Sequence, residues 1–152
     1  MLWLQNWNQE TYLSYYKSVI SLKIVSGTMK KKFIILIVDD NMSFADRMVE
    51  ILDDLDNVGY ISVAANYEEA HRLFLEQSPD LVLLDINLPG KNGIELLKFF
   101  KKTNWEGEVI MITNHTNDYY RQQCKELGAK HFLDKSNDFS LVPSIIKEEI
   151  YD

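Results

Sequence analysis

The sequence predicts an α/β sandwich in which helices cover both faces of a parallel sheet. From Phe33 onward, short continuous apolar runs alternate with longer segments of helical periodicity, which is the pattern of successive βα units. Apolar runs without alternation are typical of strands that are buried on both faces. The chain has 152 residues, enough for one compact domain with a sizeable core and too few for two of ordinary size.

The predicted elements alternate regularly along the chain. Five apolar runs are each short enough to form one strand, and they cover residues 33–38, 61–64, 81–84, 109–112 and 131–133. Helical patterns follow the runs, over residues 43–55, 67–77, 93–102, 118–127 and 140–150. Because crossover connections are right-handed, the common open arrangement of five such units is the flavodoxin-like order 2-1-3-4-5. The predicted fold is therefore a flavodoxin-like (βα)5 sandwich with a crevice where the first and third strands end.

The first 28 residues differ from the rest in composition and charge. Their net charge is +1, whereas residues 29–152 carry 14 basic and 22 acidic residues, or −8. Their aromatic side chains are Trp3, Trp7, Tyr12, Tyr15 and Tyr16. We divide the chain into an N-terminal extension over 1–28 and one domain over 29–152, because Ser26-Gly27-Thr28 is typical of a boundary. The extension is either a short amphipathic helix that docks on a partner or membrane surface, or residues upstream of a start at Met29.

Charge and cysteine content exclude several classes of protein. The chain has 16 Lys and Arg against 23 Asp and Glu, a net charge of −7, which is the wrong sign for neutralising the phosphates of nucleic acid. The single cysteine, Cys124, permits no intramolecular disulfide and is expected to be inert. No apolar run approaches the roughly 20 residues that span a bilayer. We expect a cytoplasmic protein whose partners include neither nucleic acid nor a membrane.

Polar residues follow four of the predicted strands. Asp39 and Asp40 come after the first, Asp85 after the third, Thr113 after the fourth and Lys135 just past the fifth. Taken singly, an aspartate here could cap a helix or stabilise a loop. Taken together, three carboxylates in one crevice repel one another unless a cation is bound. Oxygen ligands without thiolate or imidazole favour Mg²⁺ or Mn²⁺, and a site with few protein ligands suits Mg²⁺ acting on a phosphoryl group.

The remaining polar groups favour phosphoryl transfer. The hydroxyl of Thr113 and the ammonium of Lys135 could stabilise the oxygens of a transferring phosphoryl group, and a carboxylate can accept that group covalently. The strings IILIVDDN, LVLLDINLPGKNGIELL, VIMIT and GAKHFLDK occur in this order. On these motifs, residues 29–152 resemble a response-regulator receiver domain of two-component signalling.

The resemblance implies a role for each site residue. Asp85 would be the phosphoacceptor, Asp40 and Asp85 would bind Mg²⁺ directly, and Asp39 would act mainly through water. The main-chain carbonyl of Asn87 would be a further metal ligand, and Thr113 and Lys135 would contact the phosphoryl oxygens. Phe132 stands at the position of the family's switch aromatic, although an ordinary core phenylalanine explains it as well.

Two residues depart from the family's pattern. Ser136 follows Lys135 where the family usually has a proline with a cis peptide bond, so the loop is either trans here or retains strain. Asn114 follows Thr113 where the family prefers a small residue, which would change access to the site. His115 comes next and could act as a base on an attacking water, although a loop histidine is more often simply solvated.

Three functions compete. The first is a single-domain receiver, not an enzyme with a separate substrate, that takes a phosphoryl group from a sensor histidine kinase or phosphotransfer protein. We expect no effector domain after Asp152, so the expected output is binding to a downstream protein effector, and phosphorylation-dependent homodimerisation is left open. The second is an interaction module that works without phosphorylation. The third is an aspartate-nucleophile phosphohydrolase of the haloacid dehalogenase type, which normally has a second aspartate where this chain has Asn87.

Overall fold

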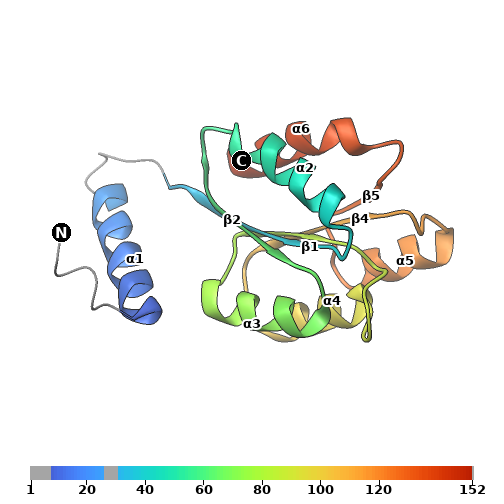
Figure 1. The fold of residues 1–152 in the computed structure, drawn as a ribbon, viewed down its shortest axis with the longest axis horizontal. Coiled ribbons are helices and arrows are strands. Elements are labelled where there is room, and N and C mark those ends of the chain that lie inside the picture. Colours follow the sequence, from blue (N-terminus) through green and yellow to red (C-terminus); the bar gives the residue numbers. More distant parts are fainter. Residues whose placement is uncertain (1–7, 26–30, 152) are drawn as a thin grey trace. The chain divides into compact units, whose positions relative to one another are not determined.

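The chain forms two compact units, Met1–Lys32 and Phe33–Asp152. The computed structural model describes residues 8–25 and 31–151. Within the first unit, helix α1 spans Gln9–Val25 (Figure 1). Asn8 stands directly before it, and its Oδ1 accepts hydrogen bonds from the main-chain N–H and the hydroxyl of Thr11, both at 2.7 Å. This contact satisfies one of the free N–H groups at the start of the helix.

The structure describes three of the five aromatic residues singled out in the extension. Tyr12, Tyr15 and Tyr16 are exposed on α1, and the rings of Tyr12 and Tyr16 stack with their centroids 6.2 Å apart. Trp3, Trp7 and the predicted boundary after residue 28 lie outside the described residues. Within residues 8–25 and 31–151, no helix combines the length and the apolar character that crossing a bilayer requires.

The second unit contains one parallel sheet of five strands in the order β2-β1-β3-β4-β5. The strands are β1 Phe33–Val38, β2 Val58–Ala64, β3 Leu81–Leu84, β4 Glu108–Thr113 and β5 His131–Asp134. This arrangement confirms the predicted fold class and strand order.

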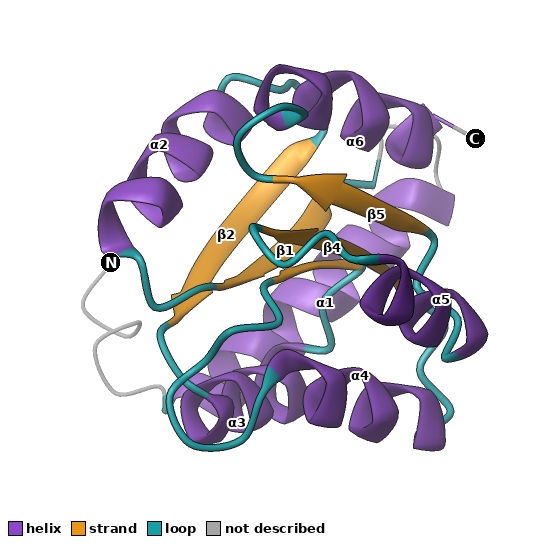
Figure 2. Ribbon diagram, turned by 90° about the vertical axis from the view of Figure 1, so that its right-hand side faces the viewer, coloured by secondary structure: helices purple, strands orange, loops and turns teal. Residues whose placement is uncertain are grey.

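Helices cover both faces of this sheet, with α2 and α6 on one side and α3, α4 and α5 on the other (Figures 1 and 2). They are α2 Met42–Asp53, α3 Tyr67–Gln77, α4 Gly93–Lys102, α5 Asp118–Glu126 and α6 Val142–Tyr151, with a short 3-10 helix, η2, at Phe139–Leu141. Because side chains alternate along a strand, β1 contributes to both cores. Ile35 and Ile37 pack with α2 and α6, whereas Leu36 and Val38 pack with α3 and α4.

Most predicted boundaries agree with the structure to within two residues, and two elements differ more. Strand β2 begins at Val58 rather than at residue 61, because Val58 pairs with Phe33 across an irregularity in the register. Gly59 and Tyr60 in this edge strand are exposed, so the segment lacks the continuous apolar run that the prediction relied on. The last predicted helix, 140–150, is divided into η2 and α6.

Four helices of the second unit begin in the same way as α1. An asparagine precedes each of them and accepts a hydrogen bond from a main-chain N–H of the first turn, and these residues are Asn41, Asn66, Asn92 and Asn117. Asparagine is among the strongest N-caps, since its side-chain oxygen satisfies a helical N–H that would otherwise lack a partner. The caps fix where each strand-to-helix loop ends, and therefore how the residues in these loops are oriented at the carboxyl edge of the sheet.

Candidate functional site

The site lies where four neighbouring strands end. Main-chain hydrogen bonds continue the strand pairing one residue further: Asp85 donates its N–H to the carbonyl of Val38 and Lys135 donates its N–H to that of Thr113, both at 3.0 Å. Asp39 is similarly attached, through its N–H, to the carbonyl of Ala64 at 3.0 Å. The positions of these side chains are therefore set by the register of the sheet itself.

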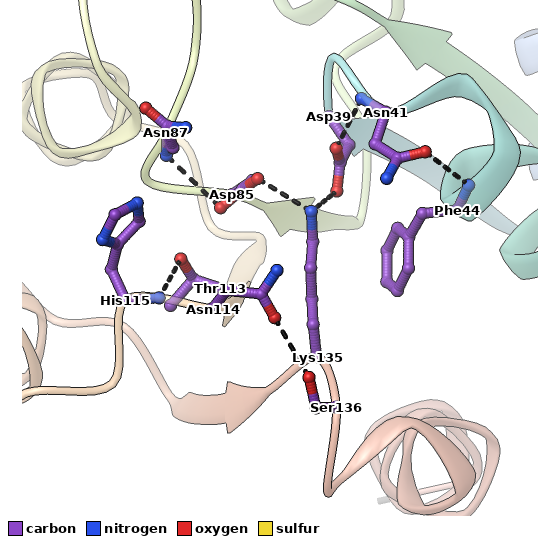
Figure 3. A network of polar contacts seen from close by, with 10 residues as sticks. All are labelled: Asp39, Asn41, Phe44, Asp85, Asn87, Thr113, Asn114, His115, Lys135 and Ser136. Carbon is purple, nitrogen blue, oxygen red and sulfur yellow. Dashed lines mark hydrogen bonds and ion pairs between the residues drawn. The ribbon is translucent and has the colours of Figure 1, made fainter.

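The ammonium of Lys135 bridges two buried carboxylates. Its Nζ lies 2.8 Å from Oδ2 of Asp85 and 2.5 Å from Oδ2 of Asp39 (Figure 3). The side chain of Lys135 is 9% exposed, and those of Asp39 and Asp85 are 1% and 6% exposed. Fifty residues of sequence separate Asp85 from Lys135, so only the folded sheet brings them together.

Burial and pairing shift the pKa values of this group in different ways. Burial raises the pKa of Asp39 above its ordinary value of 3.8, although the ion pair with Lys135 and the hydrogen bond from the N–H of Asn41 oppose the rise. Burial alone would lower the pKa of Lys135, but its contacts with Asp39 and Asp85 outweigh burial and raise it. The lysine is therefore a permanent cation at neutral pH, held against an acidic pair.

The acidic cluster fits a hard cation. Oxygens of Asp39, Asp40 and Asp85 all lie within 4.8 Å of one another, and Asp40 is exposed while the other two are buried. One ammonium leaves this group of three carboxylates with excess negative charge. Oδ2 of Asp39 is buried. Among the described residues it has an ion pair with Lys135 but accepts no hydrogen bond. An oxygen-rich site of this kind suits a divalent cation such as Mg²⁺.

Three further predicted residues lie on β4, on β5 and in the loop directly after β3. The main-chain N–H of Asn87 donates to Oδ1 of Asp85 at 3.3 Å, so the loop after β3 wraps round the carboxylate. Thr113 is fully buried at the end of β4, and its hydroxyl accepts the N–H of His115 at 3.1 Å. Phe132 lies on β5, partly buried against the core that α3 and α4 form.

The loops that depart from the family's pattern have defined structures. No cis peptide bond occurs among the described residues, so the Lys135-Ser136 bond is trans. Ser136 donates its N–H to Oδ1 of Asp134 at 2.7 Å and its hydroxyl to Oδ1 of Asn114 at 3.4 Å. The exposed ring of His115 borders, with Asn87, a surface pocket of about 110 Å³. The exposure of His115 agrees with the interpretation of this residue as a solvated loop histidine.

Two side chains beside the site were not singled out from the sequence for this role. The ring of Phe44, a residue of the predicted helix 43–55, lies with its centroid 4.6 Å from Nζ of Lys135. Arg121 on α5 has its guanidinium 4.7 Å from the ring centroid of Phe132 and donates to the main-chain carbonyl of that residue at 3.2 Å. The sequence contained a signal for Phe44, since this residue lies in the first turn of the helix that follows the acidic pair.

Comparisons with known proteins agree with this geometry. The family model described as "Response regulator receiver domain" matches residues 35–147. The "Sensory transduction protein LytT" of Bacillus subtilis is 31% identical over 114 residues, which is 75% of this chain and 46% of that protein. The "Transcriptional regulatory protein CpxR" of Escherichia coli is 37% identical over 112 residues, or 73% of this chain and 47% of that protein. The chain thus spans about half the length of these curated relatives.

A solved structure gives the same result. The signal receiver domain of a DNA-binding response regulator from Colwellia psychrerythraea superposes with a TM-score of 0.75 at 29% identity, covering 80% of this chain and 100% of that domain. The matched family model extends over Asp39, Asp85, Thr113 and Lys135. The chain therefore belongs to the response regulator receiver domain family of two-component signalling.

Proposed function

We propose that this receiver domain is a phosphorylation switch whose phosphoacceptor is Asp85. A sensor histidine kinase or a phosphotransfer protein would supply the phosphoryl group. The modified protein would then change its affinity for a downstream protein effector. The observation that carries the proposal is the Lys135 ammonium, which lies 2.8 Å from the carboxylate of Asp85 inside a cluster of three acidic residues.

The transfer step follows from the position of Asp85. A carboxylate oxygen of Asp85 attacks phosphorus, the new O–P bond forms, and the N–P bond to the donor imidazole breaks as that imidazole takes up a proton. Hydrolysis of the aspartyl phosphate by water restores the carboxylate and releases inorganic phosphate. Because the chain modifies only itself, we propose that it is not an enzyme with a separate substrate.

Residues of this chain would stabilise the charge that the transfer creates. The Lys135 ammonium already lies at hydrogen-bond distance from Asp85 and can follow a phosphoryl oxygen with little movement. The Thr113 hydroxyl can donate to a second oxygen, since a hydroxyl donates while it accepts from the N–H of His115. Asp39, Asp40, Asp85 and the main-chain carbonyl of Asn87 would hold Mg²⁺, which would supply positive charge next to the phosphoryl oxygens.

The route from the site to a binding surface would use β4, β5 and α5. Thr113 ends β4, and Met111 on the same strand pairs with Phe132 on β5. Arg121 connects Phe132 to α5, because its guanidinium lies over the Phe132 ring and donates a hydrogen bond to the Phe132 carbonyl. A hydroxyl that moves toward a phosphoryl group would leave space behind it, and Phe132 is the large side chain on the neighbouring strand that could repack there.

The test is Mg²⁺-dependent modification of the full chain. Wild type, Asp85→Asn and Asp54→Asn are incubated with a small phosphodonor or with beryllofluoride, with and without Mg²⁺, and analysed by intact mass and amide NMR. Asp54 is a matched control because it is an exposed aspartate just after α2, at the opposite edge of the sheet from the site. We expect one phosphoryl group per chain in wild type and Asp54→Asn and none in Asp85→Asn.

The NMR data test the switch separately from the chemistry. Beryllofluoride should shift the amide resonances of Thr113, Phe132 and α5 in wild type, because these residues lie along the proposed route. Modification without those shifts would refute the proposed route to the surface. A wild-type chain that takes up no phosphoryl group with Mg²⁺ would refute the phosphoacceptor assignment and favour an interaction module that works without phosphorylation.

A further inference from the structure

We propose that Phe44 is a positioning residue that holds the ammonium of Lys135 beside Asp85 through the face of its aromatic ring. The inference rests on the proposed phosphorylation of Asp85, and it adds a residue on α2 to the groups that control this reaction. Lys135 reaches Asp85 from the loop after β5, so its long side chain needs contacts on more than one side to remain in place.

Lys135 is held from two sides. Its Nζ contacts Oδ2 of Asp39 and Oδ2 of Asp85, and the ring centroid of Phe44 lies 4.6 Å from it. Figure 3 shows the Phe44 ring across the lysine side chain from Asp85. The face of an aromatic ring carries partial negative charge and attracts a cation within about 6 Å of the centroid. This attraction is strengthened here because the lysine is 9% exposed.

The ring itself is held by the start of α2 and by η2. The N–H of Phe44 donates to Oδ1 of Asn41 at 3.1 Å, and the N–H of Asn41 donates to Oδ1 of Asp39 at 2.8 Å. Two consecutive hydrogen bonds therefore tie Phe44 to the acidic cluster. The ring also meets the ring of Phe139 edge to face, with the centroids 5.7 Å apart and the planes at 73°. The guanidinium of Arg47 lies 4.5 Å from the centre of the Phe139 ring.

The ring contact differs from the carboxylate contacts in one respect that affects the reaction. A cation bound to Asp39 and Asp85 offsets their negative charge, and the attraction that those carboxylates exert on Lys135 then falls. The quadrupole of the Phe44 ring does not change when the cation or the phosphoryl group arrives. Phe44 therefore keeps the ammonium close to Asp85 during the part of the reaction in which its carboxylate contacts are weakest.

The experiment compares phosphorylation rates at saturating Mg²⁺ with a small phosphodonor, measured by intact mass. Phe44→Leu keeps an apolar side chain on α2 but removes the ring, and we expect the rate constant to fall roughly 2- to 30-fold, the range that a cation–π contact accounts for. Phe44→Tyr keeps the ring and should restore the rate to about that of wild type. NMR supplies an independent readout, since the ring current should shift the ε-methylene signals of Lys135 upfield in wild type and Phe44→Tyr but not in Phe44→Leu.

Two controls separate positioning from folding. Val49→Ala truncates another partly buried residue of α2 that packs on the same core, and it should leave the phosphorylation rate unchanged. In a Lys135→Met background, Phe44→Leu should have no further effect, because the ammonium that the ring positions is absent. A double variant that still shows the full decrease would show that Phe44 acts through packing, and would overturn the inference.

The outcome also distinguishes this inference from the proposed function. If wild type is phosphorylated and Phe44→Leu is phosphorylated at the same rate, the positioning role is refuted and the function of Asp85 stands. If wild type is not phosphorylated at all, the proposed function fails and the positioning role fails with it.

Discussion

Replacing Gly93 with alanine should displace the loop that carries Asp85. Gly93 is the first residue of α4, and its N–H donates to the carbonyl of Ile86 at 2.8 Å. A Cβ added at Gly93 would lie 1.9 Å from the carbonyl oxygen of Asp85, 2.9 Å from its carbonyl carbon and 3.0 Å from Cα of Ile86. All three atoms belong to the main chain, so no side-chain rotation can relieve the overlap.

The size of the effect follows from these distances. The methyl group and the Asp85 carbonyl oxygen must separate by about 1.5 Å before they reach the 3.4 Å at which ordinary contact begins. Overpacking of this kind lowers the free energy of unfolding by about 1–3 kcal/mol. We expect a value in the upper half of this range, because the atoms that the methyl group meets belong to the main chain. For a chain of this length that corresponds to a melting temperature lower by roughly 5–10 °C. The displaced carboxylate of Asp85 should also lose its contact with Lys135 and bind Mg²⁺ more weakly.

The assay combines urea unfolding, followed by circular dichroism, with an NMR titration of Mg²⁺. Gly90→Ala is the matched control, because Gly90 has a φ of +75° and nothing within 4 Å of the added Cβ. Its cost is limited to about 1 kcal/mol for a left-handed backbone, and its Mg²⁺ affinity should match that of wild type. Equal stability in Gly93→Ala and wild type, or equal losses in the two variants, would refute the argument from the close approach of Gly93 to Asp85.

Three other experiments have defined outcomes. Burial alone would raise the pKa of Glu149, but contacts from Lys130 at 2.6 Å and His131 at 2.9 Å outweigh it and lower the pKa below 4.5. Glu149→Gln should therefore lose about 1 kcal/mol at pH 7. Because the wild-type advantage requires the ionised carboxylate, it should shrink as the pH falls below 4.5 in urea titrations, and a loss independent of pH would contradict this account. Cys124 is fully buried and burial raises its pKa to about 11, so a thiol reagent at pH 8 should label it only in the unfolded chain, whereas rapid labelling of the native chain would contradict its burial. Phe100 is fully buried, and Phe100→Ala should cost about 3–5 kcal/mol by calorimetry, whereas a loss under 1 kcal/mol would show that the core refills the space.

Much of the fold could be predicted because the information is local. A run such as residues 33–38, FIILIV, has no polar interruption and ends at an acidic pair, which is sufficient to identify a buried strand and the point where it stops. Right-handed crossovers then leave few strand orders to choose from. The strand-end positions of Asp39, Asp85, Thr113 and Lys135 follow directly, since the carboxyl ends of parallel strands share one edge of the sheet.

Other features depend on contacts that no local pattern contains. The helical pattern of residues 43–55 predicts a helix, but not that Phe44 reaches the ammonium of Lys135, which lies 91 positions further along the chain. The trans peptide after Lys135 belongs to a loop held by Asp134, which accepts hydrogen bonds from Ser136 and Asn137. Each of these contacts depends on where the folded chain places one segment relative to another.

The sequence alone determined the class of fold, the strand order and which residues meet at the edge of the sheet, because periodicity and strand ends are properties of neighbouring residues. Only the tertiary structure decided how the side chains at that edge are paired. It showed that one lysine contacts two of the three carboxylates, that an aromatic ring lies across the lysine from Asp85, and that Gly93 leaves no room for a methyl group beside Asp85. These are distances between segments far apart in the chain, and they result from the packing of helices on the sheet.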